Sequence, residues 1–318
     1  SLSSLSVGNG EFAYTVDATG LQTFPEVYKN GVPLGTQSQW GWHSFGNPEN
    51  YKPEEALVEY DFGHGHKELY ATQPKEPGRA KEASDWYRVN PHRLHLGIIG
   101  LELGNEVRPS DVQNIQQSLD MWNGIINSRF TLKETPYYIQ TVCHPERDMI
   151  AARLSARQPA SIKFHFPYPT GGHCDDACNW EANDKHSTTL ISEDAQSAVL
   201  KRTLDATTYY VTISWEGPAK LSEKSANYFV LTPTDSIFTF TCQFTPQVSA
   251  SPILTFTEVQ QVSSGHWKNY WTQGAVADFS QCTDVRAKEL ERRVVLSQYL
   301  LAIQCAGSTP PQETGLTY

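Results

Sequence analysis

Short apolar or alternating runs, separated by glycine, proline, asparagine and aspartate, recur from Leu5 to about Pro246. Such runs are typical of β-strands, and the turn-forming residues mark the connections. Strands are predicted at residues 10–16, 94–103, 118–126, 137–142, 149–154, 161–166, 198–204, 208–215, 228–231 and 237–244. Because no segment of helical length and periodicity lies among them, the sequence predicts a mainly β fold, a large antiparallel sandwich. The Asn123-Gly124 pair favours a type I′ hairpin turn.

The pattern becomes helical after residue 250. Residues 263–273 begin with a serine cap, place Trp267 and Trp271 four residues apart on one face, and stop at Gly274. Residues 275–279 then predict an extended strand. A second helix of about five turns is predicted from Thr283 or Asp284 to Ile303, ended by Gly307, Pro310 and Pro311.

The last predicted helix is apolar around its whole circumference. Leu290, Val294 and Leu301 form one stripe, and further apolar residues fill the other faces. These further residues are Val295, Leu296, Tyr299, Leu300 and Ile303. A helix of this kind is expected to be buried on all sides. Since only fifteen residues follow Ile303, we expect the partner of this helix to lie outside the 318 residues.

Composition narrows the classes of partner. The net charge of -10 argues against nucleic acid or an anionic membrane as a partner, and no apolar stretch has the length of a membrane span. The 8 Trp and 15 Tyr fit contact with carbohydrate and fit an aromatic β-core equally well. The serine-rich start, Ser1 to Ser6, is compatible with a processed signal peptide, which predicts a periplasmic or secreted protein.

The chain resembles the N-terminal part of six-hairpin glycosidases, the clan that includes maltose-phosphorylase-type enzymes of glycoside hydrolase family 65. Residues 7–13 with 20–24 resemble the opening strand pair of that domain, and Trp267 and Trp271 resemble the tryptophan pair of its linker helix. Residues 289–300 resemble the first helix of the catalytic barrel, and residues 310–318 resemble the loop that follows it.

The resemblance implies three regions. They are a galactose-mutarotase-like β-supersandwich at 1–250, a helical linker at 251–282, and the first helix and loop of an (α/α)6 barrel at 283–318. The chain stops before the rest of that barrel, so the catalytic carboxylates of the parent enzyme are expected elsewhere. The implied function is that of a non-catalytic sandwich that supports the barrel of a glycoside hydrolase or phosphorylase, with no cofactor.

Two alternatives remain open from sequence. One is a self-standing carbohydrate-binding sandwich, which would have no use for an apolar terminal helix. The other is a β-sandwich enzyme acting alone, such as a mutarotase-like epimerase, which needs a histidine and a glutamate facing each other on one concave sheet.

The segment from Gln37 to Asn47 is the best candidate for substrate contact. Trp40 and Trp42 flank Gly41 in a stretch too rich in glycine and polar residues for a central strand. An exposed indole stacks on the C–H face of a sugar, and His43, with nearby amides, supplies hydrogen bonds to hydroxyls. The competing interpretation is that both tryptophans anchor the loop on the core. The resemblance implies that such a loop leans over the rim of the barrel.

The remaining polar clusters are weaker candidates. Cys174 and Cys178, with His173 or Asp175, are compatible with a small disulfide, with part of a Zn²⁺ site, or with free thiols. Residues 63–66 predict a hairpin tip rather than a metal site, so no metal site is assigned. Cys143 and Cys242 are predicted to be buried thiols, and Cys282 and Cys305 to stand too far apart to pair. The glycine-rich nucleotide and α/β-hydrolase motifs do not occur in the sequence.

Overall fold

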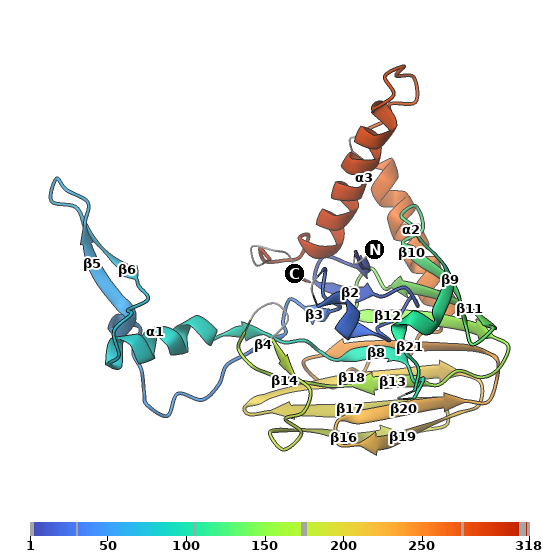
Figure 1. Ribbon diagram of the computed structural model, residues 1–318, viewed down its shortest axis with the longest axis horizontal. Helices are drawn as coiled ribbons and strands as arrows, with labels where there is room; N and C mark the ends of the chain where they lie inside the picture. Colours follow the sequence, from blue (N-terminus) through green and yellow to red (C-terminus); the bar gives the residue numbers. More distant parts are fainter. Residues whose placement is uncertain are drawn as a thin grey trace.

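The computed structural model is dominated by antiparallel β-sheets stacked in two layers, with helices at their edges (Figure 1). It describes residues 3–29, 31–104, 106–172, 177–274, 277–311 and 316. Every strand pair in this part of the chain is antiparallel. The mainly β prediction is therefore confirmed.

The first layer is one eight-stranded sheet. Its strands run in the order β16 (His186–Glu193), β17 (Ser197–Leu204), β18 (Thr207–Glu216), β21 (Ile237–Thr245), β12 (Met149–Ala156), β11 (Thr135–Cys143), β10 (Ile125–Leu132) and β9 (Val112–Asp120). Alternation along these strands is visible in β10, where Ile126, Ser128, Phe130 and Leu132 are buried while Arg129 is exposed.

The second layer consists of two smaller sheets. One has the order β19 (Ala219–Ser225), β20 (Tyr228–Pro233), β13 (Ile162–His165) and β8 (Ile98–Leu101), and the other has the order β1 (Leu5–Gly8), β2 (Phe12–Val16) and β3 (Thr36–Ser38). Three two-stranded pairs are β4 (Trp42–His43) with β7 (His92–Arg93), β5 (Leu57–Asp61) with β6 (Lys67–Ala71), and β14 (Tyr168–Pro169) with β15 (Cys178–Asn179). Short 3-10 turns occupy η1 (Pro25–Tyr28), η2 (Pro53–Ala56) and η3 (Pro109–Asp111).

Aromatic side chains join the two layers. Phe164 of β13 meets Phe240 of β21 edge to face at 6.0 Å between ring centroids. Phe12 of β2 stacks on Phe244 of the same strand β21 at 5.9 Å. Both contacts belong to one continuous apolar core, so the small sheets share the inner face of the large one.

The core also encloses a charged side chain, Arg202 of β17, which is fully buried. Nε donates to the Tyr209 hydroxyl, and Nη1 donates to Thr188 and Asn227. Nη2 donates to the Pro167 carbonyl and to Nδ1 of His186, so all five guanidinium N–H groups have acceptors. These bonds offset the cost of burying the charge, since a guanidinium with unmade hydrogen bonds would be strongly destabilising.

An arm, residues 44–91, leaves the sandwich between β4 and β7 (Figure 1). It carries η2, the β5–β6 hairpin and the helix α1 (Arg79–Val89). The hairpin tip at residues 63–66, predicted from sequence, is confirmed. α1 is a helix within the region predicted to be free of helices, so that prediction is wrong here. Its sequence contains few apolar residues and buries only Ala83 and Ser84, which is why no apolar stripe marked it.

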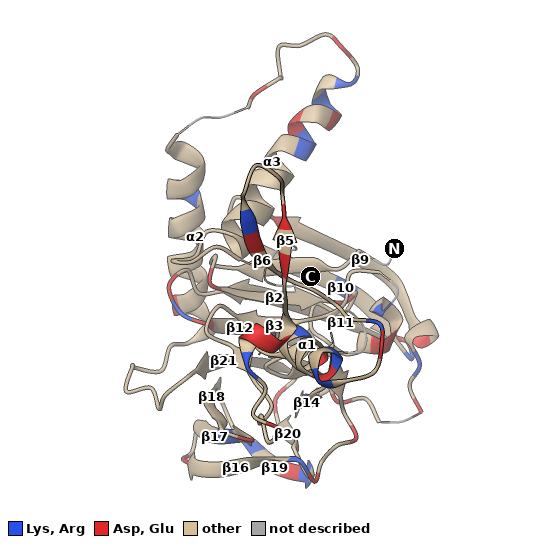
Figure 2. Cartoon of the chain, turned by 90° about the vertical axis from the view of Figure 1, so that its left-hand side faces the viewer, with Lys and Arg blue, Asp and Glu red and all other residues tan. Residues whose placement is uncertain are grey.

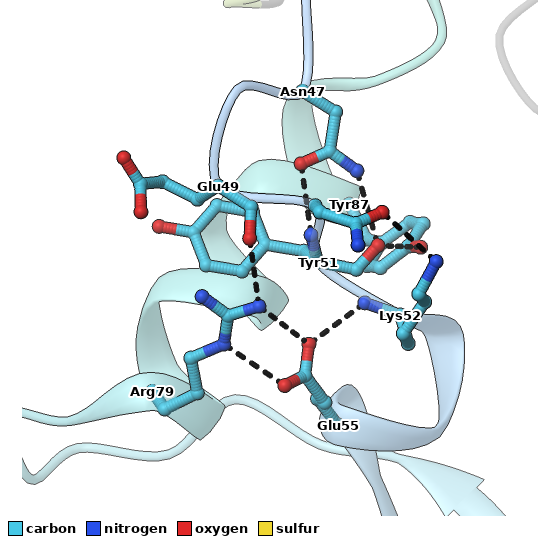
Figure 3. A network of polar contacts seen from close by, with 8 residues as sticks. Asn47, Glu49, Tyr51, Lys52, Glu55, Arg79 and Tyr87 are labelled. Atoms are coloured by element: carbon cyan, nitrogen blue, oxygen red, sulfur yellow. Dashed lines mark hydrogen bonds and ion pairs between the residues drawn. The ribbon is translucent and has the colours of Figure 1, made fainter.

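A polar network joins the start of α1 to the segment that precedes the β5–β6 hairpin (Figure 3). The Arg79 guanidinium bonds both carboxylate oxygens of Glu55, at 2.9 and 3.2 Å, and the Glu49 carbonyl at 2.9 Å. It also lies 4.5 Å from the centre of the Tyr51 ring. Arg79 thereby ties the first turn of α1 to the segment that precedes the hairpin.

The helix α2 (Phe256–Thr272) begins earlier than the predicted Ser263. Thr255 caps it, because its hydroxyl accepts from the Glu258 amide at 3.2 Å while the Glu258 carboxylate accepts from the Thr255 amide at 2.8 Å. This reciprocal capping box was present in the sequence as Thr255-x-x-Glu258. Phe256 and Val259 then pack on an apolar cluster at the outer face of β10–β12.

The terminal helix α3 (Ala287–Gln304) starts after the predicted caps Thr283 and Asp284. Its first turns are charged and its second half is uncharged, as Figure 2 shows. Tyr299 and Ile303 are buried against β1, β2 and Trp267, but Leu300 and Leu301 are 38% and 59% exposed. Within the described residues α3 is therefore not buried on all sides, and its burial by a partner outside the 318 residues stays a prediction.

Two local predictions are also corrected. The β9–β10 hairpin has a four-residue turn at 121–124, in which Gly124 has φ +65 but Asn123 is not left-handed, so the turn is not type I′. A Cβ at Gly124 would lie 2.1 Å from the Trp267 ring, and this close approach explains the glycine. Residues 277–279 form no strand, while 275–276 lie outside the described residues.

We expect the free energy of unfolding to fall as the pH drops from about 6.5 toward 4. Burial lowers the pKa of His95 and of His186 to about 4. Nδ1 of His95 accepts a hydrogen bond from the Gly97 amide, so a proton on Nδ1 would make two N–H groups face each other and break this bond. As the pH falls, the unfolded chain binds these protons at a higher pH than the folded protein does. The free energy of unfolding therefore falls by on the order of 1 kcal/mol per pH unit for each ring.

Urea unfolding at a series of pH values measures this slope. His95→Gln keeps a polar side chain and removes one titrating group, so its slope should be shallower than that of the wild type. Equal slopes for the two proteins would contradict the assignment.

Candidate functional site

The segment predicted to contact substrate forms a sharp turn between β3 and β4. The Gly41 amide donates to the Ser38 carbonyl at 3.0 Å, and the Trp42 amide donates to the Trp40 carbonyl at 2.8 Å. A Cβ at Gly41 would approach the Ser38 carbonyl to 3.2 Å. This tight turn sends the two tryptophans into different surroundings.

Trp40 is half-buried and held from the core side. Its indole N–H donates to Asp148 Oδ2 at 2.6 Å, and Ser38 donates to the same oxygen at 2.5 Å. Its ring lies 5.9 Å from that of Tyr209. Burial raises the pKa of Asp148, and the hydrogen bonds from Ser38 and Trp40 counteract that shift. In this structure Trp40 therefore has the anchoring role that the sequence left as the competing interpretation.

Trp42 is 42% exposed. It pairs with Arg93 across β4 and β7, and the Arg93 guanidinium lies 4.5 Å from the centre of a Trp42 ring. Arg93 is itself held by a 2.8 Å bond to the Ser38 carbonyl, which fixes the cation against the indole. Trp42 thus offers an exposed aromatic surface with a positioned cation beside it.

His43 is buried, and both of its ring nitrogens are engaged. Nδ1 lies 2.9 Å from His92 Nε2, and Nε2 lies 3.0 Å from Asp205 Oδ2. Tyr168 donates to the same Asp205 oxygen at 2.7 Å. Burial lowers the pKa of His43 and of His92, with Asp205 acting in the opposite direction. A sugar contact from the His43 ring would require one of these bonds to break.

The amides near this segment are also occupied in part. Gln39 donates to Ser308 at 2.7 Å, and Asn47 bonds both backbone groups of Tyr51. Gln37 Oε1 is buried and has no hydrogen-bond partner among the described residues. Of the residues predicted to contact saccharide, Trp42 is therefore the one with a substantially exposed side chain, and the contact itself stays a prediction.

Sequence reasoning missed four residues that shape the candidate site: Arg93, His92, Asp148 and Asp205. His92 and Asp205 lie 49 and 162 positions from His43. Their convergence follows from the pairing of β4 with β7 and from the β17–β18 turn, neither of which has a local sequence signal. His92 Nδ1 also bonds the Val89 carbonyl at 2.7 Å, so both of its ring nitrogens are engaged within the protein.

The other predicted clusters contribute no further site. Residues 173–176, and with them Cys174, lie outside the described residues, while Cys178 is a free thiol. Cys143 and Cys242 are buried free thiols as predicted, and Cys282 and Cys305 are free as well. Within the described ranges no three His, Cys, Asp or Glu side chains gather in a metal-binding arrangement. No described helix has the length and apolarity to cross a membrane.

The epimerase alternative required a histidine and a glutamate on one sheet face. His165 of β13 and Glu102, just after β8, lie on the same face by strand alternation. However, one oxygen of Glu102 pairs with Lys224 at 2.6 Å, and the other accepts from Tyr228. A carboxylate occupied at both oxygens is poorly placed to act as a free general base.

No protein-family profile matches the chain, and no curated protein matches it. Similarity appears among solved structures. A protein assigned as a kojibiose phosphorylase, from the human microbiome, superposes with a TM-score of 0.51 at 9% identity, over 94% of this chain and 39% of that chain. The chain has a glycosidase-like fold. The fold implied by the sequence resemblance is thereby confirmed, and this chain spans about two fifths of the length of the phosphorylase structure.

Two further structures superpose more loosely. A bacterial glucoamylase in complex with acarbose has a TM-score of 0.42 at 10% identity, over 61% of this chain and 32% of that chain. A family GH92 alpha-mannosidase from Bacteroides thetaiotaomicron has a TM-score of 0.35 at 9% identity, over 93% of this chain and 38% of that chain.

We expect Trp40→Ala and Trp42→Ala to differ in their effect on stability. Loss of the Trp40 ring and of its bond to Asp148 should lower the free energy of unfolding by about 3 kcal/mol. Loss of the exposed Trp42 ring removes mainly its contact with Arg93 and should cost about 1 kcal/mol or less. Urea titration of the two variants measures both values, and equal losses would show that both rings anchor the loop.

Proposed function

We propose that this chain is the β-sandwich and linker region of a carbohydrate-active enzyme, a glycoside hydrolase or phosphorylase. In this proposal it supports a helical catalytic domain of the same polypeptide, and the loop around Trp42 contributes to the rim of the saccharide site. The fold shared with a protein assigned as a kojibiose phosphorylase supports the enzyme class. The catalytic residues are proposed to lie outside these 318 residues.

The observation that carries the proposal is the uncharged half of α3. Leu300 and Leu301 are exposed there, while the buried side chains of Tyr299 and Ile303, which flank them in the sequence, fix the helix on the sandwich. An apolar surface on a helix that is already anchored favours packing against further helices of the same protein. A self-standing carbohydrate-binding module has no need of such a surface. Val295 and Leu296, which are half-buried, do not discriminate between the two functions.

We expect the longer polypeptide encoded by the gene to cover this surface. Hydrogen exchange at residues 294–303 should be slower in that polypeptide than in the 318-residue chain. The double substitution Leu300→Glu and Leu301→Glu should weaken the packing of the proposed helical domain on the 318-residue region by roughly 3 kcal/mol. The reason is that the two leucine side chains would otherwise be buried in that interface.

Ile115→Glu is a matched control, since Ile115 is a similarly exposed apolar residue (49%) on the edge strand β9 rather than on α3. Identical exchange in the short and long proteins would overturn the supporting role.

The rim loop is tested by titration calorimetry of the long polypeptide with a panel of glycans. Loss of the Trp42 ring should weaken saccharide binding by about tenfold, the effect of losing roughly 1.4 kcal/mol of stacking. An unchanged binding profile for Trp42→Ala would remove the loop from the saccharide site while leaving the supporting role intact.

A further inference from the structure

A polar groove lies between α2 and the outer face of β9–β11, away from the candidate loop. In Figure 1 α2 and these strands are at the right of the molecule, whereas β4 is at the left. The hollow beside α2 has a volume of about 650 Å³, and a second one of about 460 Å³ shares Asn127 with it. Volumes of roughly 300–1,000 Å³ are usual for small-molecule sites. The groove belongs to neither the core nor the rim loop.

One wall of the groove is a single polar stripe of α2. The stripe consists of Thr257, Gln260, Gln261, Ser264, Gly265 and Lys268. Their spacing of three and four residues places them on one face of the helix. The buried residues of α2, Phe256, Val259, Ser263 and Trp267, lie on another face, which holds the helix on the sheet. The polar stripe is therefore presented by a helix fixed from behind.

Gly265 in this stripe has no structural reason to be glycine. It lies in the interior of α2, its φ is not left-handed, and a Cβ there would meet nothing within 4 Å. Glycine within a helix is less stable than alanine. The contrast with Gly124 is clear, because that glycine is required by its positive φ and by the Trp267 ring. Gly265 lines the groove, where the absence of a side chain lets a ligand approach the helix backbone.

The facing wall is formed by side chains that are already oriented. Asn127 Oδ1 accepts from the Tyr138 hydroxyl at 2.7 Å and from Gln140 Nε2 at 3.0 Å. These bonds fix both amide groups. Asn127 Nδ2 and Gln140 Oε1 then form no hydrogen bond within the described part of the chain. A fixed donor and acceptor side by side are suited to adjacent hydroxyl groups.

The part of the groove beside α2 carries no net charge, because it has one acidic and one basic residue. Asp120 and Lys268 are its two charged residues there, and the other polar groups are amides and hydroxyls. In the second hollow, Arg129 lies 4.9 Å from the centre of the Tyr138 ring and has no carboxylate partner among the described residues. The positive charge of Arg129 therefore lies only at the end of the groove that the second hollow forms. Neutral amides, hydroxyls and one aromatic ring suit an uncharged polyol better than an anion or an apolar group.

We propose that this groove binds an uncharged oligosaccharide chain, with one sugar between Gly265 and Asn127 and a neighbouring sugar toward Tyr138. The site goes beyond the proposed rim loop and requires neither Trp42 nor a catalytic domain. It would hold glycan on the outer face of the eight-stranded sheet.

Calorimetric titration of the 318-residue chain with maltohexaose, cellohexaose, xylohexaose and mannohexaose tests the proposal. At least one should bind, and Gly265→Trp should abolish that binding because the new side chain fills the hollow. Gln260→Ala combined with Gln261→Ala should weaken binding by about tenfold, the effect of losing one or two hydrogen bonds. Gly265→Ala should raise the thermal midpoint, showing that the position tolerates a side chain.

Gln196→Ala, in the exposed β16–β17 turn, is the matched control and should bind like the wild type. Two results would each overturn the proposal. They are no binding of any of the four glycans at millimolar concentration, and binding that is unaffected by Gly265→Trp. If Trp42→Ala lost glycan binding while Gly265→Trp bound glycan like the wild type, the glycan would be assigned to the rim loop instead.

Discussion

The indole of Trp267 holds the helical part of this protein on its sandwich. The ring lies against the Gly124 backbone and 4.7 Å from the ring of Tyr299. One contact fixes α2 on the β9–β10 turn, and the other fixes α3 on α2. The groove beside α2 and the exposed apolar half of α3 both depend on this junction, because each is a surface of a helix positioned by it. Aromatic rings in such contact contribute more than their buried area alone suggests.

The arm depends on a different constraint, the short pair of β4 and β7. His43 and His92 face each other in this pair and connect to Asp205 in the sandwich. Further out, Arg79 and Glu55 join α1 to the base of the β5–β6 hairpin near the surface, where salt screens such pairs. The arm is therefore joined to the sandwich through a buried polar contact and braced further out by an exposed one. Trp42 and Arg93 belong to β4 and β7, so the exposed ring is positioned by the strand pair from which the arm leaves the sandwich.

Strands such as β13 and β18 could be predicted because the signal of alternation is local, and the glycine-rich turn at 63–66 required no knowledge of distant residues. Most of β10 was missed, because the predicted strand at 118–126 spans the end of β9, the turn at 121–124 and only the first two residues of β10. The helices were less predictable. α1 buries too little apolar surface to show a stripe, and the start of α2 was signalled only by Thr255 and Glu258. The surroundings of the candidate loop depend on Asp148, His92 and Asp205, which reach it through the topology. Of the residues nominated for substrate contact, Trp42 and Trp40 took different roles because a single glycine turn separates them.

The contacts of α3 join the two extremes of the chain. The Tyr299 hydroxyl donates to the Ser6 carbonyl at 3.1 Å, and the Gly10 amide donates to the Ile303 carbonyl at 3.0 Å. During synthesis the first strand is made long before the helix that completes its hydrogen bonds. Closing a loop of this length is slow compared with forming local hairpins. The Ser6 carbonyl and the Gly10 amide therefore bond to water until α3 has been made, which makes this closure a late event in the folding of the sandwich.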